Sequence, residues 1–181
     1  MRFTALFAAA AGLTLAAAPA AAHQHSHHGQ SARAGRTVVD LAVGSPDFST
    51  LVTAVQAAGL AETLSGKGPF TVFAPTNAAF AKLPAGTVDT LVQPANREQL
   101  TRVLTYHVVP GRINAAQLTQ RIRRGGGTAT LTTVQGGKLT ARLRGSTVVL
   151  TDAKGGTSRV TKTNLNASNG VIHAIDTVVM P

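Results

Sequence analysis

The stretch "LTYHVVPGRI" (residues 104–113) decides the fold, because a helical pattern changes to an extended one inside it. The pattern before the change is one apolar stripe at helical spacing that ends at a histidine: Leu100, Val103, Leu104 and His107. The valines that follow favour a strand, and a Pro-Gly pair ends it. We therefore expect the His107 ring to point into the core. Tyr106 should bury its ring and keep its hydroxyl near the surface.

The residues before this stretch favour short helices around one strand. Apolar residues at helical spacing in residues 47–59 predict an amphipathic helix that ends at Gly59. The β-branched and aromatic run at 69–73 predicts a strand, after which Thr76 or Asn77 caps a short helix. Further helical turns are expected over residues 87–92, 95–107 and 114–122.

The residues that follow a run of three glycines (125–127) alternate apolar with Thr, Lys or Arg. This period of two predicts antiparallel strands joined by tight glycine turns, over residues 128–134, 138–144, 147–152 and 158–163. The final run, 170–180, is apolar along most of its length, as in a strand that is covered on both faces. The sequence therefore predicts an α+β fold, with helices in the first half and antiparallel strands afterwards.

The N-terminus has the composition of a targeting segment. Residues 1–22 begin with a positive charge, continue as an alanine-rich apolar run and end in an A-x-A pattern, which predicts a secretory signal peptide. The alternative is a membrane span, which the alanine richness and the processing-type end disfavour. Residues 23–36 are polar and lack apolar periodicity, so we expect a disordered arm before a single domain at 37–181. The mature protein should be secreted, periplasmic or extracellular.

The charge of the chain is strongly basic. Seventeen Lys and Arg against seven Asp and Glu give a formal net charge of +10. A basic exported protein is expected to meet anionic partners such as acidic polysaccharides or lipid headgroups, although the charge also serves solubility. The candidate contacts lie in the second half of the chain: Arg121, Arg123, Arg124, Arg142 and Arg144. Arg142 and Arg144 should share one face of a strand.

Motifs for catalysis are absent from the sequence. There is no P-loop, H-E-x-x-H or G-x-S-x-G pattern, and the chain has no cysteine. His173 and Asp176 are three residues apart in a strand, so their side chains should point to opposite faces. His107 and His173 lack an obvious third metal ligand, and we expect both to be hydrogen-bonded core histidines. We therefore predict that the protein is not an enzyme.

The arm carries a cluster of histidines. His23, His25, His27 and His28 lie within six residues, and His-rich tracts bind Cu, Ni or Zn. Cleavage after Ala22 would leave a free amine with histidine in the third position, a set of nitrogens that suits square-planar Cu(II) or Ni(II). The alternative is a solvated tail. We expect incidental or scavenging metal binding here rather than a catalytic centre, and no cofactor elsewhere.

Three stretches together, "FTVFAPTNAAF" (70–80), "LTYHVVPGRI" (104–113) and "NGVIHAIDTVVMP" (169–181), closely resemble the signature blocks of fasciclin (FAS1) domains. The resemblance covers roughly residues 37–181 and implies an α+β wedge with a β-sandwich-like core. The matching positions, expected to be structural, are Thr76, Asn77, His107, Asn169, Gly170, His173 and Asp176. In animal relatives the Tyr-His block, here Tyr106 and His107, is linked to integrin recognition. Asn77 stands where relatives often have Asp, and Asn164-Leu165 where they often have Asp-Ile.

The resemblance implies a binding protein. The leading hypothesis is an exported adhesion or matrix-interaction module that binds surface proteins or anionic polysaccharides, without specific binding of nucleic acid. Its candidate contacts are the five arginines together with Tyr106 and His107. The alternative is a periplasmic protein that binds a metal or small ligand through the histidine arm. For the Tyr-His pair itself, an architectural role is favoured over recognition. The oligomeric state stays open.

Overall fold

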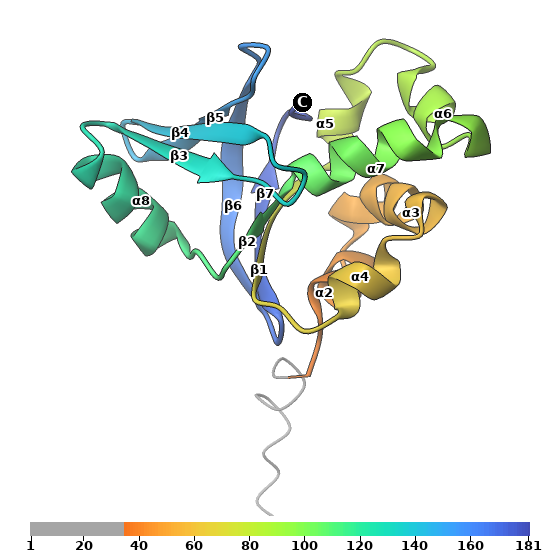
Figure 1. Ribbon diagram of the computed structural model, residues 1–181, viewed down its shortest axis with the longest axis horizontal. Helices are drawn as coiled ribbons and strands as arrows, with labels where there is room; N and C mark the ends of the chain where they lie inside the picture. The colour runs from red at the N-terminus through yellow and green to blue at the C-terminus, as the bar shows by residue number, and fades with distance from the viewer. Residues whose placement is uncertain (1–34) are drawn as a thin grey trace, which may run out of the picture.

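The computed structural model describes residues 35–181, so the expected signal peptide and the four histidines of the arm lie outside the described residues. Figure 1 shows a layer of short helices on one side of a strongly twisted sheet, and a single helix beside the far end of the sheet. The helices are α2 (Val38–Val43), α3 (Ser49–Ala58), α4 (Ala61–Ser65), α5 (Asn77–Ala81), α6 (Thr87–Leu91), α7 (Arg97–Tyr106) and α8 (Ala115–Arg124). Short 3-10 turns precede α3 (Pro46–Phe48) and α7 (Pro94–Asn96).

The strands within residues 35–181 form one seven-stranded sheet in the order β2-β1-β7-β6-β5-β4-β3. Their bounds are β1 (Phe70–Pro75), β2 (Val108–Pro110), β3 (Thr128–Thr132), β4 (Lys138–Arg144), β5 (Thr147–Thr151), β6 (Thr157–Ala167) and β7 (Gly170–Ile175). The α+β class and the order of helices before strands are confirmed. All neighbouring strands are antiparallel except β1 and β7, which run parallel through six residue pairs.

Strand β6 joins the two halves of the sheet. Its first residues, 157–159, pair with β5, and residues 160–167 pair with β7. Two register shifts lie in the second part, and Asn164 there has a positive φ of 58°. Bulges of this kind bend a strand and increase its twist. The bend brings the two edges of the sheet together, where the amide of Val134 donates to the carbonyl of Val108 at 2.7 Å.

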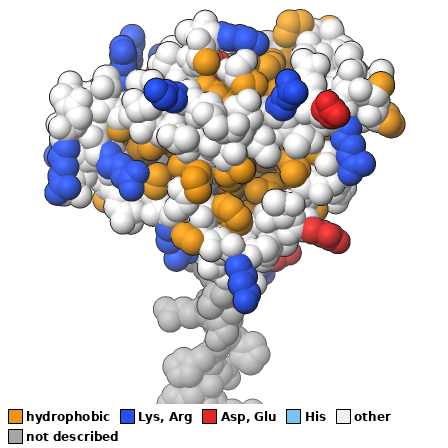
Figure 2. Space-filling view, viewed as in Figure 1, with side chains coloured by type: hydrophobic (Ala, Val, Ile, Leu, Met, Phe, Trp, Pro, Cys, Tyr) orange, Lys and Arg blue, Asp and Glu red, His pale blue; other side chains and the backbone are white. Residues whose placement is uncertain are grey.

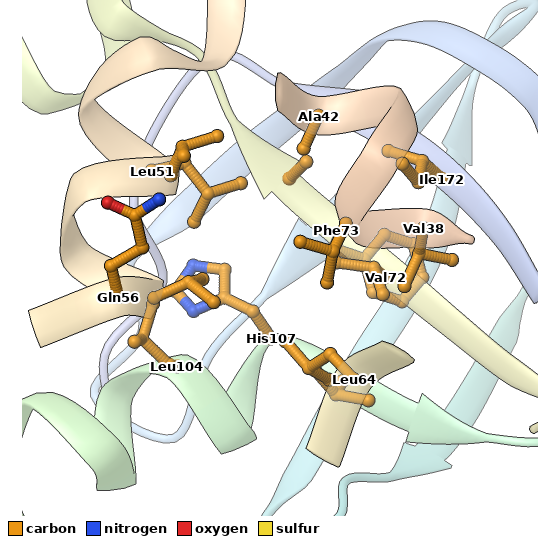
Figure 3. A pocket seen from close by; sticks show the side chains of 15 residues that line it. Val38, Ala42, Leu51, Gln56, Leu64, Val72, Phe73, Leu104, His107 and Ile172 are labelled. Carbon is orange, nitrogen blue, oxygen red and sulfur yellow. The ribbon is translucent and has the colours of Figure 1, made fainter. Parts of the chain in front are cut away.

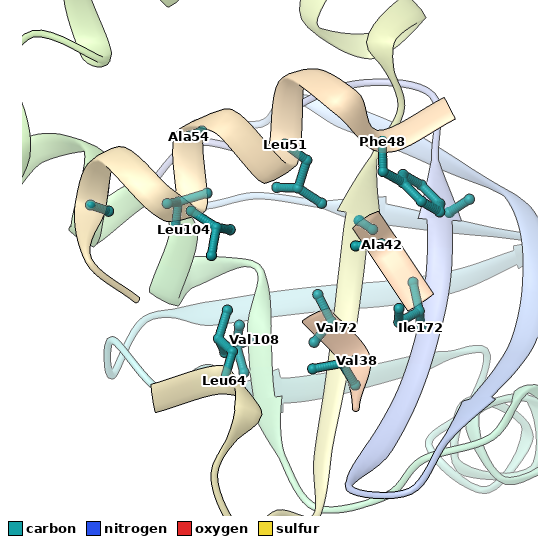
Figure 4. Close-up of a cluster of buried hydrophobic side chains, with 14 of the residues drawn as sticks. Val38, Ala42, Phe48, Leu51, Ala54, Leu64, Val72, Leu104, Val108 and Ile172 are labelled. Atoms are coloured by element: carbon teal, nitrogen blue, oxygen red, sulfur yellow. The ribbon is translucent and has the colours of Figure 1, made fainter. Parts of the chain in front are cut away.

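Two hydrophobic clusters lie on the two faces of the central strands. Val72, Ala74, Ile172 and Ala174 of β1 and β7 face the helices α2, α3, α4 and α7 (Figure 4). Phe73 and Ile175, which point the other way, pack with β3, β4, β5 and α8. The period of two therefore places each side of β7 in a core, and all six of its residues are buried. The final strand is covered on both faces, as the sequence predicts.

Local sequence explains where the helices begin. Thr76 caps α5, because its hydroxyl accepts from the amide of Ala79 at 3.3 Å. Asn114 caps α8 in a capping box with Gln117, in which each side chain accepts from the other residue's amide. These caps satisfy backbone donors that a helix N-terminus leaves free. Within residues 35–181, no helix has the length and apolar character needed to cross a membrane.

Candidate binding surface

His107 lies at the C-terminal end of α7 and is 2% exposed. Its Nδ1 donates to the carbonyl of Val103 (2.7 Å), and its Nε2 accepts from the amide of Val179 (3.2 Å). Burial lowers the pKa of His107 to about 4, so the ring is neutral near pH 7. Val179 belongs to the last residues of the chain, so this bond ties α7 to the end of the chain.

Tyr106 is fully buried, including its hydroxyl. The hydroxyl donates to the carbonyl of Lys138 (2.7 Å) and accepts from the amide of Ala153 (3.1 Å). Burial raises its pKa. The ring lies against Gly137, where any side chain would begin 2.6 Å from a ring carbon. The expectation of a hydroxyl near the surface is therefore wrong, because two hairpins supply backbone partners that water would otherwise supply.

Beneath α2, α3 and α4 lies an apolar cavity, drawn in Figure 3, whose lining includes His107. Its volume is about 40 Å³, far below the about 300–1,000 Å³ of small-molecule sites. Both ring nitrogens of His107 already have backbone partners, so the histidine offers the cavity no free polar atom. The cavity is a packing defect of the core. It is too small for an organic ligand.

Two asparagines of the signature blocks hold chain segments that are distant in sequence. Asn77 accepts from the amide of Thr50 (3.0 Å) and donates to the carbonyl of Pro46 (2.8 Å), so it fixes the start of α3. A carboxylate at this position would lack the donor for Pro46. Asn169 accepts from the amide of Val38 (2.9 Å) and donates to the carbonyl of Leu64 (2.7 Å). It thereby fixes α2 and α4 against the end of the sheet.

The remaining signature positions also have backbone partners. Gly170 lies so close to Phe70 that an added Cβ would meet the carbonyl oxygen at 2.2 Å. His173 Nε2 donates to the carbonyl of Ile113 at 2.9 Å, and its ring stacks on Phe73. Asp176 accepts from the amide of Arg159 at 2.8 Å. His173 and Asp176 therefore have separate partners. Among the residues that the structure describes, no group of three side chains is placed to hold a metal ion.

The structure divides the five predicted arginines into two groups. Arg121, Arg123 and Arg124 lie exposed in the last turn of α8, where positive charge favours a helix C-terminus. Helix α8 packs on the inner face of β3 and β4 through Leu118 and Ile122. Arg142 and Arg144 are exposed on the opposite, outer face of β4. The β3–β4 ribbon therefore separates the two groups.

The outer face of β4, β5 and β6 contains a further arginine that the sequence did not single out. Arg159 on β6 lines one hollow with Arg142 and Arg144. Alternation in "SRVTKT" (158–163) places Arg159 on the polar face of its strand, but only the register across β5 shows that it joins the other two. Within residues 35–181 the ion pairs are Lys82–Asp176 and Lys162–Asp47, so no arginine there is neutralised by a carboxylate.

Figure 2 shows how charge is distributed on one face of the molecule. Lys and Arg side chains are spread over the whole face, on the side of α8, β3 and β4 as well as on the helical side, and the prominent acidic side chains lie toward the α2–α7 helices. We name the group Arg142, Arg144 and Arg159 the outer arginine face. It is the exposed cationic cluster that the sheet assembles, whereas the Tyr-His block is enclosed.

The sequence model of the fasciclin domain matches residues 46–181. The chain belongs to the fasciclin domain family. It is 48% identical over 145 residues to protein sll1483 of Synechocystis sp., which covers 80% of this chain and 73% of that protein. It is also 37% identical over 145 residues to the transforming growth factor-beta-induced protein ig-h3 of Sus scrofa, over 80% of this chain and 19% of the relative.

The fold has a counterpart among solved structures. A FAS1 domain pair from the insect cell adhesion molecule fasciclin I superposes with a TM-score of 0.70 at 18% identity. The match covers 81% of this chain and 51% of the other, so this fasciclin chain spans about half of that two-domain chain. The expected FAS1 fold is confirmed. The match describes the fold, and the binding partner of this chain has to be argued from its own surface.

Proposed function

We propose that this fasciclin domain is an exported, non-enzymatic adhesion module that binds anionic surface polysaccharide through the outer arginine face. The observation that carries the proposal is the exposure of Arg142, Arg144 and Arg159 around one hollow, without a carboxylate partner in residues 35–181. Like charges held this close repel one another, and a bound polyanion relieves that repulsion. Fasciclin I, an insect cell adhesion molecule, contains domains of the same fold, which supports a role in attachment.

Tyr106 and His107 are assigned an architectural role in this proposal. Their exposures of 0% and 2% leave no side-chain surface for a partner of the folded domain. Their polar atoms are already hydrogen-bonded to backbone groups of three other segments: Lys138, Ala153 and Val179. A partner that used either side chain would first have to break these contacts.

The proposal is tested by retention of the purified protein on beads that carry an acidic polysaccharide, with neutral dextran beads as reference. We expect retention on the acidic beads that falls steeply with added salt, because exposed charges are screened beyond about 10 Å at 0.1 M salt. The variant Arg142→Glu/Arg144→Glu should no longer be retained on the acidic beads. Retention that is equal at low and high salt would contradict the proposal.

A matched control separates a local effect from a change in net charge. Lys67, between α4 and β1, and Arg102, on α7, are exposed on the helical side of the domain. The variant Lys67→Glu/Arg102→Glu makes the same change in net charge as Arg142→Glu/Arg144→Glu. We expect this control to keep most of its retention. Equal loss in the two variants would show that net charge alone, and not the outer arginine face, determines binding.

A further inference from the structure

The register of three strands places one arginine on each side of a valine. Arg142 pairs with Val149, and Val149 pairs with Arg159, so the three residues form one row across β4, β5 and β6. Residues opposite each other in antiparallel strands point to the same side of the sheet. Neighbouring strands are about 4.8 Å apart, which places the two arginine backbones about 10 Å from each other.

Val149 is 7% exposed although it points away from the core. Its neighbours Val148 and Leu150 belong to the cluster on the inner face, and alternation turns Val149 to the outer side. Arginine stems commonly cover apolar surface while their guanidinium groups stay in water. The row therefore places a nearly buried valine between two exposed arginines, whose apolar stems line the hollow with it.

Hydroxyl groups complete the hollow. Thr151 and Thr157 pair directly across β5 and β6 and line the same space, as do Arg144 and Gly127. Thr151 is partly exposed and Thr157 is exposed, so both hydroxyls can donate to and accept from a ligand. The volume of the hollow is about 400 Å³. Ligand sites for small molecules span about 300–1,000 Å³.

We infer that this hollow is a subsite for one uronic acid residue of an acidic polysaccharide, which names the ligand class of the proposed function and rests on it. The planar guanidinium of arginine binds a carboxylate through two parallel hydrogen bonds. The apolar face of a pyranose ring packs on the arginine stems and the exposed edge of Val149, and its hydroxyls meet Thr151 and Thr157. A bare anion would leave Val149 and both threonines unused.

Nucleic acid fits this hollow less well. Single strands are bound by grooves in which bases stack on aromatic side chains. The residues that line the hollow include no aromatic side chain: Gly127, Arg142, Leu143, Arg144, Val149, Thr151, Thr157 and Arg159. A sugar that carries a carboxylate uses all three kinds of group present, namely guanidinium, methyl and hydroxyl.

The experiment is a titration of the full chain, followed by amide NMR, with trigalacturonate, with the neutral trisaccharide of galactose and with inorganic phosphate. We expect trigalacturonate to shift amides of β4, β5 and β6 and to bind at least about tenfold more tightly than either other probe. Arg142→Gln and Arg159→Gln should each weaken it about tenfold. Val149→Thr keeps the branched shape and should weaken it by about threefold, since it removes one methyl from the apolar surface of the hollow.

The control is Arg121→Gln/Arg123→Gln on α8, which should change trigalacturonate affinity less than about twofold. If phosphate and trigalacturonate shift the same amides with equal affinity, the hollow is a simple anion site. That result overturns this inference and leaves the proposed function standing. If the chain binds neither trigalacturonate nor any acidic polysaccharide on beads, both are overturned. Unfolding curves of each variant distinguish lost binding from lost structure.

Discussion

The Tyr-His block and the outer arginine face show two opposite uses of polar side chains in one domain. Tyr106 and His107 are buried, and each polar atom of their side chains has a backbone partner. Arg142 and Arg159 are exposed, and within residues 35–181 no carboxylate pairs with them. A buried polar group without its partner costs folding free energy, whereas an exposed cation without a partner costs little and remains free to bind. Residues that are buried and fully hydrogen-bonded are therefore assigned to the architecture of the domain, and residues that are exposed and unpaired to the binding surface.

The largest effect is expected from truncating the buried tyrosine. Tyr106→Ala should lower the free energy of unfolding by about 4 kcal/mol, because it leaves a large cavity and unpairs Lys138 and Ala153. Urea unfolding followed by circular dichroism measures it. Tyr106→Phe keeps the ring and should lose only about 1–2 kcal/mol. If Tyr106→Ala unfolds like the parent protein but no longer attaches to acidic beads, the tyrosine belongs to the binding surface and the contrast is reversed.

The second prediction concerns pH. Well above pH 6.5, the ordinary pKa of histidine, His107 is neutral in the folded and the unfolded chain, so its contribution to stability is constant. As the pH falls toward the folded-state pKa of about 4, the unfolded chain binds a proton that the buried ring cannot accept. The free energy of unfolding should fall by about 3 kcal/mol across this window. Burial lowers the pKa of His173 as well, so its contribution has the same sign.

The matched control for this pH effect is His107→Gln, which removes the titrating group. Its free energy of unfolding should start lower and then vary less between pH 6.5 and 4 than that of the parent protein. Chemical denaturation at a series of pH values gives both curves. Parallel curves for the two proteins would mean that His107 is accessible to protons in the folded state, which contradicts its enclosure.

The third prediction is the converse of the first. Arg142→Glu/Arg144→Glu should leave the free energy of unfolding within about 0.5 kcal/mol of the parent value, since both side chains are exposed and unpaired. Its affinity for acidic polysaccharide should fall at least about tenfold, with a weaker dependence on salt. Binding isotherms at two salt concentrations measure both. A loss in the free energy of unfolding as large as that of Tyr106→Phe would mean that these arginines stabilise the fold.

Several features of the fold could be predicted from local sequence because local interactions determine them. The helical stripe that ends at His107 predicts an inward ring, and Thr76 and Asn114 cap helices as their side chains suggest. The strand alternation likewise determines which side chains of β3 and β4 face the core. In each case the pattern or cap that supports the prediction spans only a few residues of the sequence.

Other features depend on contacts between distant segments. The parallel pairing of β1 with β7 joins residues about a hundred positions apart, and no local pattern indicates it. Tyr106 is fully enclosed because two separate hairpins supply its partners, Lys138 and Ala153. Arg159 joins Arg142 only through the registers of two strand pairs, across the turn at residues 152–156. The local sequence therefore predicted that Arg142 and Arg144 share one face of a strand, but not that Arg159 joins them.

The smallest effect is expected at the end of α8, where the basic residues lie on the other side of the ribbon from the outer arginine face. Arg123→Ala/Arg124→Ala should lower the free energy of unfolding by about 0.5–1 kcal/mol, because cations near a helix C-terminus stabilise the helix dipole. Polysaccharide affinity should change less than about twofold, since long-range attraction between exposed charges is screened. Thermal unfolding and bead retention of the same sample compare the two effects. A large loss of retention with unchanged stability would show that the arginines of α8 also bind the polysaccharide. The two arginine groups would then belong to one binding surface that continues around the edge of β3.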